Sequence, residues 1–127
     1  MTSDILDAFA EAIHERHGTG VVALDMSAQP LTMEAFLITT AENRIQARAI
    51  ADIVQETARN TGFTRHHIEG YDEGSWILID YVDLVVHIFL PDTRDYYDLE
   101  MLWSDVPSIR FDDDREQRDE NTVITQD

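Results

Sequence analysis

Two carboxylates close in sequence, Asp80 and Asp83, are the best candidates for metal chemistry in this chain. Together they could hold a divalent cation of the kind used in phosphoryl and nucleotidyl transfer. Such chemistry also needs a cradle for the phosphates, and the only glycine-rich candidate, Gly18-Thr19-Gly20, is short and has no Lys after it. Metal-dependent nucleotidyl transfer therefore stands only as the alternative function, and we expect no catalytic residues and no enzyme activity.

The histidines and the missing cysteines bear on a possible metal site. The chain has five His and no Cys, which excludes disulfides, thiolate ligands and a Cys nucleophile. His14 and His17 are one residue short of the zincin spacing, and the adjacent His66 and His67 would point to opposite faces of a strand. We therefore expect no bound metal and no cofactor, and we interpret His87 as a sheet histidine that is hydrogen-bonded, for example to an acid.

Residues 75–80 and 83–89 are predicted to form two strands of a hairpin joined by Tyr81-Val82. A tight turn would pair Asp80 with Asp83 and Trp76 with His87. Neither loop residue favours the positive φ of a two-residue turn, which leaves a wider loop and a shifted pairing open. Because side chains alternate, one face of the hairpin is wholly aliphatic and should pack against helices. The other face is mixed and carries Trp76, Leu78, Asp80, Asp83, Val85, His87 and Phe89.

This mixed face has two interpretations. A large aromatic residue ringed by polar groups is typical of the centre of a protein–protein interface. Trp76 could equally belong to a core beneath a further helix, because both faces of an α/β sheet can be covered. Tyr97 and Trp103 leave the same choice open, whereas helical spacing favours core positions for Leu99 and Leu102.

The elements around the hairpin predict a single α/β domain. Apolar residues at helical spacing indicate one helix between Ser3 and Gly18, and a second, long helix that Thr39-x-x-Glu42 would cap and that ends before Gly62. Short runs rich in β-branched residues indicate strands at residues 21–26, 35–40 and 65–69, and a short helix or irregular cover follows at 93–103. The predicted order is α-β-β-α-β-β-β-α, with one mixed five-stranded sheet and packed helices.

The length and charge of the chain restrict its partners. Its 127 residues suit one domain, which we place at residues 1–110; residues 111–127 hold seven acids and two Arg and are predicted to be a disordered acidic tail. A net charge of −17 disfavours direct binding of free nucleic acid and favours a basic protein partner.

The acidic N-terminus lacks an apolar signal-peptide core, and no apolar run reaches membrane-spanning length. We therefore expect a soluble cytoplasmic protein with no membrane partner.

One long motif in the second half of the chain resembles a known family. It reads Glu69-Gly70-x-x-x-Gly74-x-Trp76-x-Leu78-x-Asp80-Tyr81-x-Asp83-x-x-Val86-His87-x-Phe89, followed by Thr93-Arg94-x-x-Tyr97-Asp98-Leu99-Glu100-x-Leu102-Trp103. This pattern is similar to the ribosomal silencing factor family (RsfS, related to Iojap), and the resemblance spans residues 5–107. The chain departs from the family pattern at Glu34-Ala35-Phe36 and at Glu42-Asn43-Arg44.

The resemblance implies a fold, a partner and a mode of action. It implies a mixed-sheet domain similar in topology to nucleotidyltransferases but without their activity. It implies binding to large-subunit ribosomal protein fourteen, which sterically blocks joining of the two ribosomal subunits and represses translation under nutrient limitation. A homodimer is a further possible state of the chain away from the ribosome. On this basis the predicted partner-binding residues are Trp76, Leu78, Asp80, Tyr81, Asp83, His87, Tyr97 and Trp103.

Overall fold

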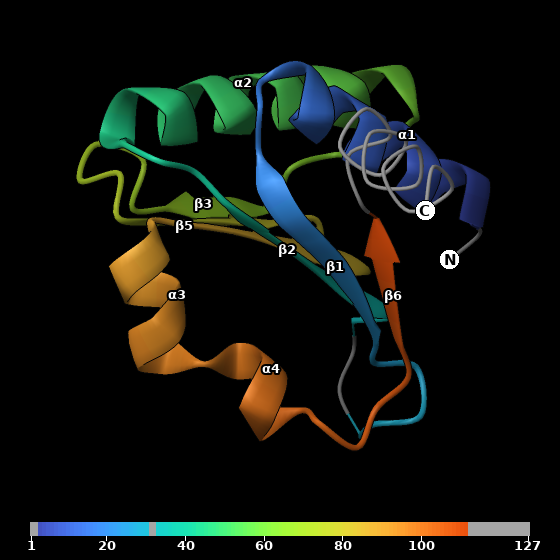
Figure 1. Cartoon of the computed structure of the whole chain (residues 1–127). Helices are drawn as coiled ribbons and strands as arrows, with labels where there is room; N and C mark the ends of the chain where they lie inside the picture. Colours follow the sequence, from blue (N-terminus) through green and yellow to red (C-terminus); the bar gives the residue numbers. More distant parts are fainter. Residues whose placement is uncertain (1–2, 31–32, 112–127) are drawn as a thin grey trace, which may run out of the picture.

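A single mixed sheet with helices on both faces organises the chain (Figure 1). The computed structural model describes residues 3–30 and 33–111. Its elements in chain order are α1 (Ser3–Glu15), β1 (Thr19–Asp25), β2 (Ala35–Thr40), α2 (Arg44–Asn60), β3 (His67–Glu69), β4 (Trp76–Asp80), β5 (Leu84–Phe89), α3 (Pro91–Tyr97), α4 (Leu99–Leu102) and β6 (Ser108–Phe111). The predicted α/β class and single mixed sheet are confirmed.

The strands lie in the order β3-β4-β5-β2-β1-β6. The central neighbours β2 and β5 are parallel, and the connection between them contains α2, β3 and β4. All other neighbours are antiparallel. The parallel pair is therefore at the centre of the sheet, and the antiparallel hairpin β4–β5 lies beside it.

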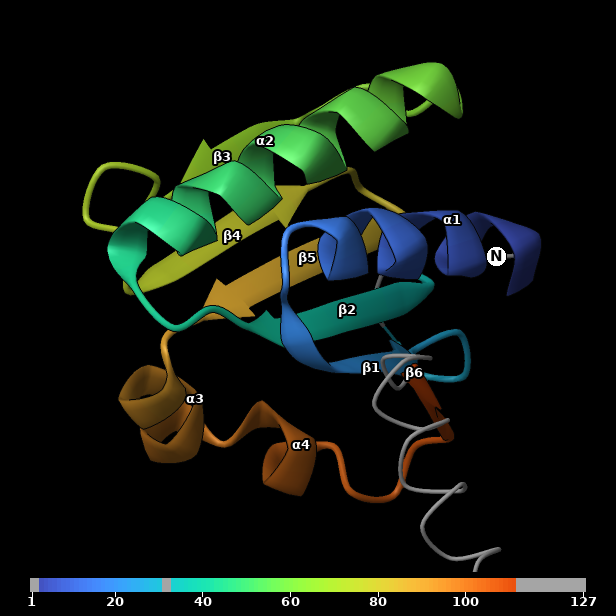
Figure 2. The ribbon, with the colours of Figure 1, turned by 45° about the horizontal axis from the view of Figure 1, so that its top comes forward.

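The two faces of the sheet are covered to different degrees. Helices α1 and α2 lie across one face, and the short helices α3 and α4 lie on the other (Figures 1 and 2). The α1–α2 side encloses the larger core, here the helix-covered core, which includes the aliphatic side chains predicted to face the helices: Ile77, Ile79, Leu84, Val86 and Ile88. A second, smaller core under α3 and α4 contains Val22, Leu24, Met26, Phe36, Ile38, Val85, Phe89 and Val106.

The long helix α2 begins at a cap that differs from the predicted one. Thr39 is a buried residue of β2, and its hydroxyl donates to the Thr19 carbonyl at 2.9 Å. The N-cap is Asn43, whose Oδ1 accepts a hydrogen bond from the Gln46 backbone N–H at 2.8 Å. The Gln46 side chain in turn accepts from the Glu42 N–H. The first of these bonds satisfies a donor that the first helical turn leaves unpaired, and the second satisfies the N–H of the residue before the cap.

The sheet has six strands, whereas five were predicted. The additional strand is β6, which pairs antiparallel with β1, with Ala23 opposite Ile109 and Val21 opposite Phe111. It is four residues long and mostly exposed, so it gives only a weak hydrophobic pattern in the sequence. Phe111, the first residue of the predicted tail, belongs to this strand; the rest of the predicted tail, residues 112–127, lies outside the described residues. The resemblance to nucleotidyltransferase topology stays a prediction.

The hairpin β4–β5 has a wider loop than the tight turn predicted. Trp76 pairs with Phe89 and Leu78 with His87, a register two residues away from the expected one. Val82 takes a φ of 73° in the loop, where the Tyr81 N–H donates to the Leu84 carbonyl at 2.8 Å. Because a shift of two residues restores the same alternation, every strand side chain keeps its predicted face.

Candidate partner-binding surface

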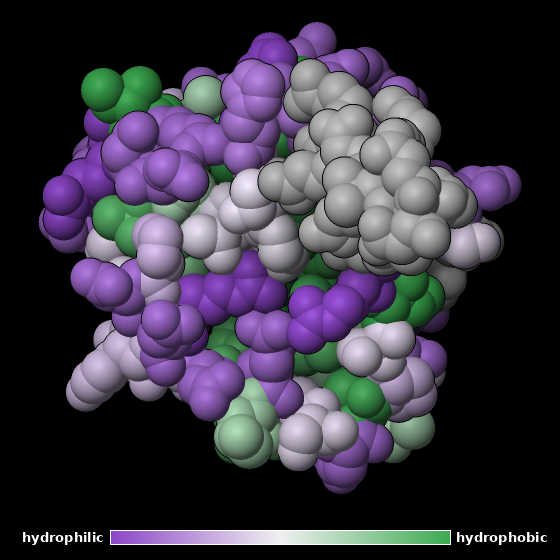
Figure 3. All heavy atoms as spheres, in the orientation of Figure 1, coloured by the Kyte–Doolittle hydropathy of each residue, from purple (hydrophilic) through white to green (hydrophobic). Residues whose placement is uncertain are grey.

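The arm formed by α3 and α4 carries a concentration of exposed apolar side chains. Tyr96 is 81% exposed, Met101 68%, Leu102 67% and Tyr97 49%, and neither helix buries a residue completely. Exposed apolar side chains gathered on neighbouring elements are typical of interaction sites. In Figure 3 green hydrophobic residues reach the surface around α4 among purple hydrophilic ones. We call this surface the aromatic face and define it by Trp76, Leu78, Tyr96, Tyr97, Met101, Leu102 and Trp103.

Trp76 lies where the arm meets the sheet. Its indole ring is half-buried, with ring centroids 4.9 Å from Phe89 and 4.5 Å from Tyr97. The indole Nε1–H donates to His87 Nδ1 at 3.1 Å. The two interpretations of Trp76 are therefore combined in one residue: part of the ring packs on the second core, and the rest is accessible to a partner.

His87 supports Trp76 from beneath and lies too deep to contact a partner itself. Its side chain is buried, and its ring contacts Phe36 at a centroid distance of 4.9 Å in an edge-to-face arrangement. Burial lowers the pKa of His87 from 6.5 to about 4, so the ring is neutral at physiological pH. A neutral ring keeps Nδ1 free of a proton and able to accept the Trp76 hydrogen bond. Its hydrogen-bond partner is thus the indole and not an acid.

The buried His87 should make folding stability depend on pH. Between about pH 4 and 6.5 the unfolded chain binds a proton at this residue and the folded chain does not, so stability rises with pH in that window. Lowering the pH from about 7 to about 4.5 should cost about 2 kcal/mol through His87 alone. The measurement is urea unfolding of the wild type and His87→Gln at both pH values.

The wild type and His87→Gln should lose different amounts of folding stability on acidification. The difference between the two losses is the contribution of His87. The Gln side chain still offers an oxygen to the indole but does not titrate. His66→Gln, at an exposed histidine, is the control substitution. An equal loss of stability in the wild type and His87→Gln on acidification would show that His87 does not contribute.

Tyr81, one of the predicted partner-binding residues, lies on the opposite side of the sheet from the aromatic face and is not available to a partner there. Its ring is buried in the helix-covered core, 6.4 Å from Phe9 and 6.0 Å from Phe63 between centroids. Burial raises the pKa of Tyr81 to about 12. The physical reason is simple alternation, because Tyr81 continues the inward series of Ile77 and Ile79 beyond the end of β4.

The two carboxylates of the hairpin lie at its loop. Asp80 is partly exposed, and its Oδ1 accepts a hydrogen bond from the Val82 backbone N–H at 2.7 Å. Asp83 is exposed, and its backbone carbonyl accepts from the Glu34 and Ala35 N–H groups. One Asp80 oxygen therefore stabilises the wide loop, while both carboxylates remain accessible to solvent.

Arg94 fixes the arm to the sheet, a role that the sequence did not reveal. Its side chain is largely buried, its Nε donates to Glu100 Oε1 at 2.9 Å, and its Nη1 donates to Thr40 Oγ1 at 2.8 Å. These bonds join α3, α4 and the end of β2. Between the two helices Asp98 adopts a left-handed conformation with φ of 46°, which turns the chain sharply. The aromatic face is therefore held in a defined orientation.

Some of the remaining residues of α3, α4 and the segment after them pack on the second core, and others are exposed to solvent. Leu99 and Trp103 are partly buried against the second core, and Trp103 lies 6.3 Å from Phe36 between ring centroids. Leu102 is exposed, so its predicted core position is wrong, because α4 has only four residues and presents that side to solvent. Tyr96 and Met101 were not predicted site residues. The sequence feature that could have indicated this surface is the aromatic pair Tyr96-Tyr97, which lies in a helix otherwise poor in apolar residues.

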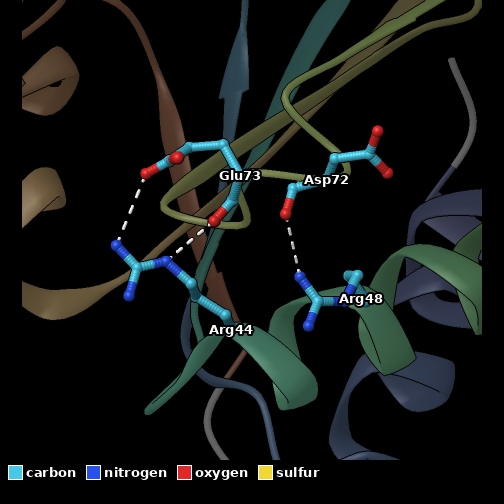
Figure 4. A network of polar contacts seen from close by, with 4 residues as sticks. All are labelled: Arg44, Arg48, Asp72 and Glu73. Carbon is cyan, nitrogen blue, oxygen red and sulfur yellow. Dashed lines mark hydrogen bonds and ion pairs between the residues drawn. The ribbon is translucent and has the colours of Figure 1, made fainter.

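The loop before β4 is held by two arginines of α2 (Figure 4). Arg44 Nε donates to the Glu73 carbonyl at 2.8 Å, and its guanidinium also approaches the Glu73 carboxylate at 3.4 Å. Arg48 Nη1 donates to the Asp72 carbonyl at 3.1 Å. These contacts connect the start of α2 to the loop that leads into Trp76, and they restrict where β4 begins.

Within residues 3–30 and 33–111, no group of three or more His, Asp or Glu side chains is arranged to hold a metal ion. The helices in this part of the chain include none with the length and apolar character needed to cross a membrane.

Comparisons with known proteins identify the family. The family model described as ribosomal silencing factor during starvation matches residues 1–127. A ribosomal silencing factor of Bacillus subtilis is 38% identical over 108 residues, which cover 85% of this chain and 92% of the relative. A crystal structure of a Chromobacterium violaceum protein is similar with a TM-score of 0.76 and 33% sequence identity, covering 82% of this chain and 88% of that chain. A Mus musculus protein named for mitochondrial assembly of the ribosomal large subunit is 46% identical over 37 residues, 29% of this chain and 16% of its own length. The chain belongs to the ribosomal silencing factor family.

Proposed function

We propose that this chain represses translation in the cytoplasm by occupying the large ribosomal subunit when nutrients are limited. It binds ribosomal protein fourteen of that subunit and sterically blocks joining of the small subunit. Membership of the ribosomal silencing factor family supports a ribosome-associated role in repression. The name of the mouse relative, which refers to assembly of the large subunit, supports the choice of subunit.

The observation that carries the proposal is the aromatic face on an acidic chain. Helices α3 and α4 expose four apolar side chains, of which Tyr97 packs against the half-buried Trp76, and the chain carries a net charge of −17. An apolar centre with acidic surroundings suits a basic protein such as a ribosomal protein, because desolvated aromatic contacts give affinity and charge speeds encounter. An interface of about 800 Å² per partner would be enough to exclude the small subunit.

The proposed contact residues are those predicted residues that the structure leaves accessible. They are Trp76, Leu78, Asp80, Asp83, Tyr97 and Trp103, with Tyr96, Met101 and Leu102 added from the arm. His87 acts indirectly by holding the indole, and Tyr81 stabilises the helix-covered core. A second copy of the chain would compete for the same apolar surface, so a homodimer away from the ribosome and binding to the subunit would exclude each other.

The alternative, metal-dependent nucleotidyl transfer, receives no support from the described residues. Asp80 uses one carboxylate oxygen to accept the Val82 N–H, and no third acidic or histidine ligand joins Asp80 and Asp83 in the part of the chain that the structure describes.

A subunit-joining assay tests the proposal. Purified chain is added to separated small and large ribosomal subunits, and the fraction of joined ribosomes is measured by sucrose-gradient sedimentation. Joined ribosomes should decrease as the fraction of large subunits that carry the chain increases. Normal joining at saturating occupancy of the large subunit would contradict steric blocking, and sedimentation of the chain with small subunits alone would contradict the choice of subunit.

A further inference from the structure

A shallow hollow lies at the junction of β4 and α3, at one end of the aromatic face. Its lining residues are Ser75, Trp76, Asp92, Thr93, Tyr96 and Tyr97, and its volume is about 420 Å³. Three of these six residues are aromatic and one is acidic. The hollow is open to solvent and is large enough for one long side chain of a partner.

The aromatic rings that line the hollow are inclined to one another at different angles. The Trp76 and Tyr97 centroids are 4.5 Å apart with ring planes inclined at 47°, and the Tyr96 and Tyr97 centroids are 5.0 Å apart with planes at 87°. At these separations the paired rings are in contact, so a cation has access only to ring faces that the neighbouring ring does not cover. Aromatic faces arranged in this way attract cations, with Trp the strongest and Tyr next.

The polar residues of the hollow match the same kind of ligand. The carboxylate of Asp92 makes no hydrogen bond or ion pair with any other residue of the described ranges, so it is available to a cation. The hydroxyls of Ser75 and Thr93 add oxygen acceptors. The chain also carries a net charge of −17, which favours positively charged ligands near its surface.

We propose that this hollow receives an arginine side chain of the basic partner, held by cation–π contacts with Trp76, Tyr96 and Tyr97 and by the Asp92 carboxylate. The inference rests on the proposed function, because the arginine belongs to the ribosomal protein that the chain binds. Arginine fits better than lysine, since a planar guanidinium stacks on aromatic rings and directs several N–H donors toward nearby oxygens. The hollow therefore determines which basic surface the aromatic face recognises.

Substitutions of Tyr96 test the inference without disturbing the fold, because this side chain is 81% exposed. Tyr96→Phe keeps the aromatic face, whereas Tyr96→Leu keeps apolar area and removes the π-system. Affinity for purified large ribosomal subunits should stay within about twofold for Tyr96→Phe and fall about 3- to 30-fold for Tyr96→Leu. Asp92→Asn, which removes the charge at nearly constant volume, should weaken binding as well. Wild-type affinity in Tyr96→Leu, or equal losses in Tyr96→Phe and Tyr96→Leu, would overturn the inference.

A second measurement separates this inference from the proposed function. N-acetyl-arginine amide is titrated into the full chain while NMR shifts are followed, with N-acetyl-citrulline amide as the neutral analogue of the same shape. The arginine compound should shift signals of Trp76, Tyr96 and Tyr97, and the citrulline compound should not. Equal shifts with both compounds, or none with either, would overturn the cation site even if the chain binds the ribosome. Selective shifts in a chain that does not bind large subunits would keep the cation site and reject the proposed partner.

Discussion

Replacing Trp76 with alanine is expected to weaken binding to large ribosomal subunits about 30- to 1000-fold, or about 2–4 kcal/mol. The indole is a large, partly accessible ring on the aromatic face, and His87, Phe89 and Tyr97 hold it in one orientation. A ring fixed in this way loses little conformational freedom on binding, so most of its contact energy contributes to affinity. The measurement is equilibrium affinity for purified large subunits.

The same substitution should leave the chain folded. Trp76 is half-buried, so its truncation should cost less than the about 3–5 kcal/mol typical of a fully buried tryptophan, and His87 Nδ1 loses its donor as well. Urea unfolding of Trp76→Ala therefore accompanies the affinity measurement. Ile45→Ala is the control, because Ile45 is an exposed apolar side chain that lies on α2, on the other side of the sheet (Figure 1). A folded Trp76→Ala that binds as tightly as the wild type would remove this residue from the interface.

Gly70→Ala should destabilise the fold by about 2–5 kcal/mol. Gly70 has a φ of +79°, which costs a residue with a Cβ about 1–2 kcal/mol. A Cβ at this position would also overlap the backbone carbonyl oxygen of Trp76, and relieving such a clash typically costs a further 1–3 kcal/mol, roughly. The loop cannot move away freely, because Arg44 and Arg48 hold it against α2.

Gly62→Ala separates the two contributions. Gly62 has a similar φ of +87°, but a Cβ there would meet no atom within 4 Å, so this variant should lose only the backbone contribution. Urea unfolding of both variants gives the comparison. Gly70→Ala should also bind large subunits more weakly, because the shift displaces Trp76. Equal losses of stability in Gly70→Ala and Gly62→Ala would show that the structure relieves the overlap between the new Cβ and the Trp76 carbonyl oxygen at no cost in free energy.

The fold could be predicted from the sequence wherever one face of an element is buried. Strand alternation in β4 and β5 placed every side chain on its correct face, even though the loop was wider than the tight turn predicted and the register shifted by two residues. The edge strand β6 was missed because it is short and largely exposed. The start of α2 was misplaced because Thr39 and Asn43 both carry capping side chains; the Thr39 hydroxyl instead bonds the Thr19 carbonyl in the sheet, and Asn43 is the N-cap.

The candidate surface was predicted less completely. Trp76, Leu78 and Tyr97 could be recognised from their residue types and from the family-like motif. Tyr81 was predicted to bind a partner from its place in the family-like motif, whereas its alternation with Ile79 points it into the helix-covered core. The role of Arg94 depends on contacts with Thr40, 54 residues away in the chain, and no local pattern encodes such a contact.

Site-specific photocrosslinking tests the central claim most directly, because it reports which molecule touches the aromatic face. A photoreactive phenylalanine derivative is placed at Tyr97, which is 49% exposed beside Trp76, or at Ile45 on α2 as the control position. Each protein is irradiated with purified large ribosomal subunits, and the crosslinked partner is identified by mass spectrometry. We expect a crosslink from position 97 to ribosomal protein fourteen and none to that protein from position 45. A crosslink to ribosomal protein fourteen from position 45 with none from position 97 would contradict this expectation.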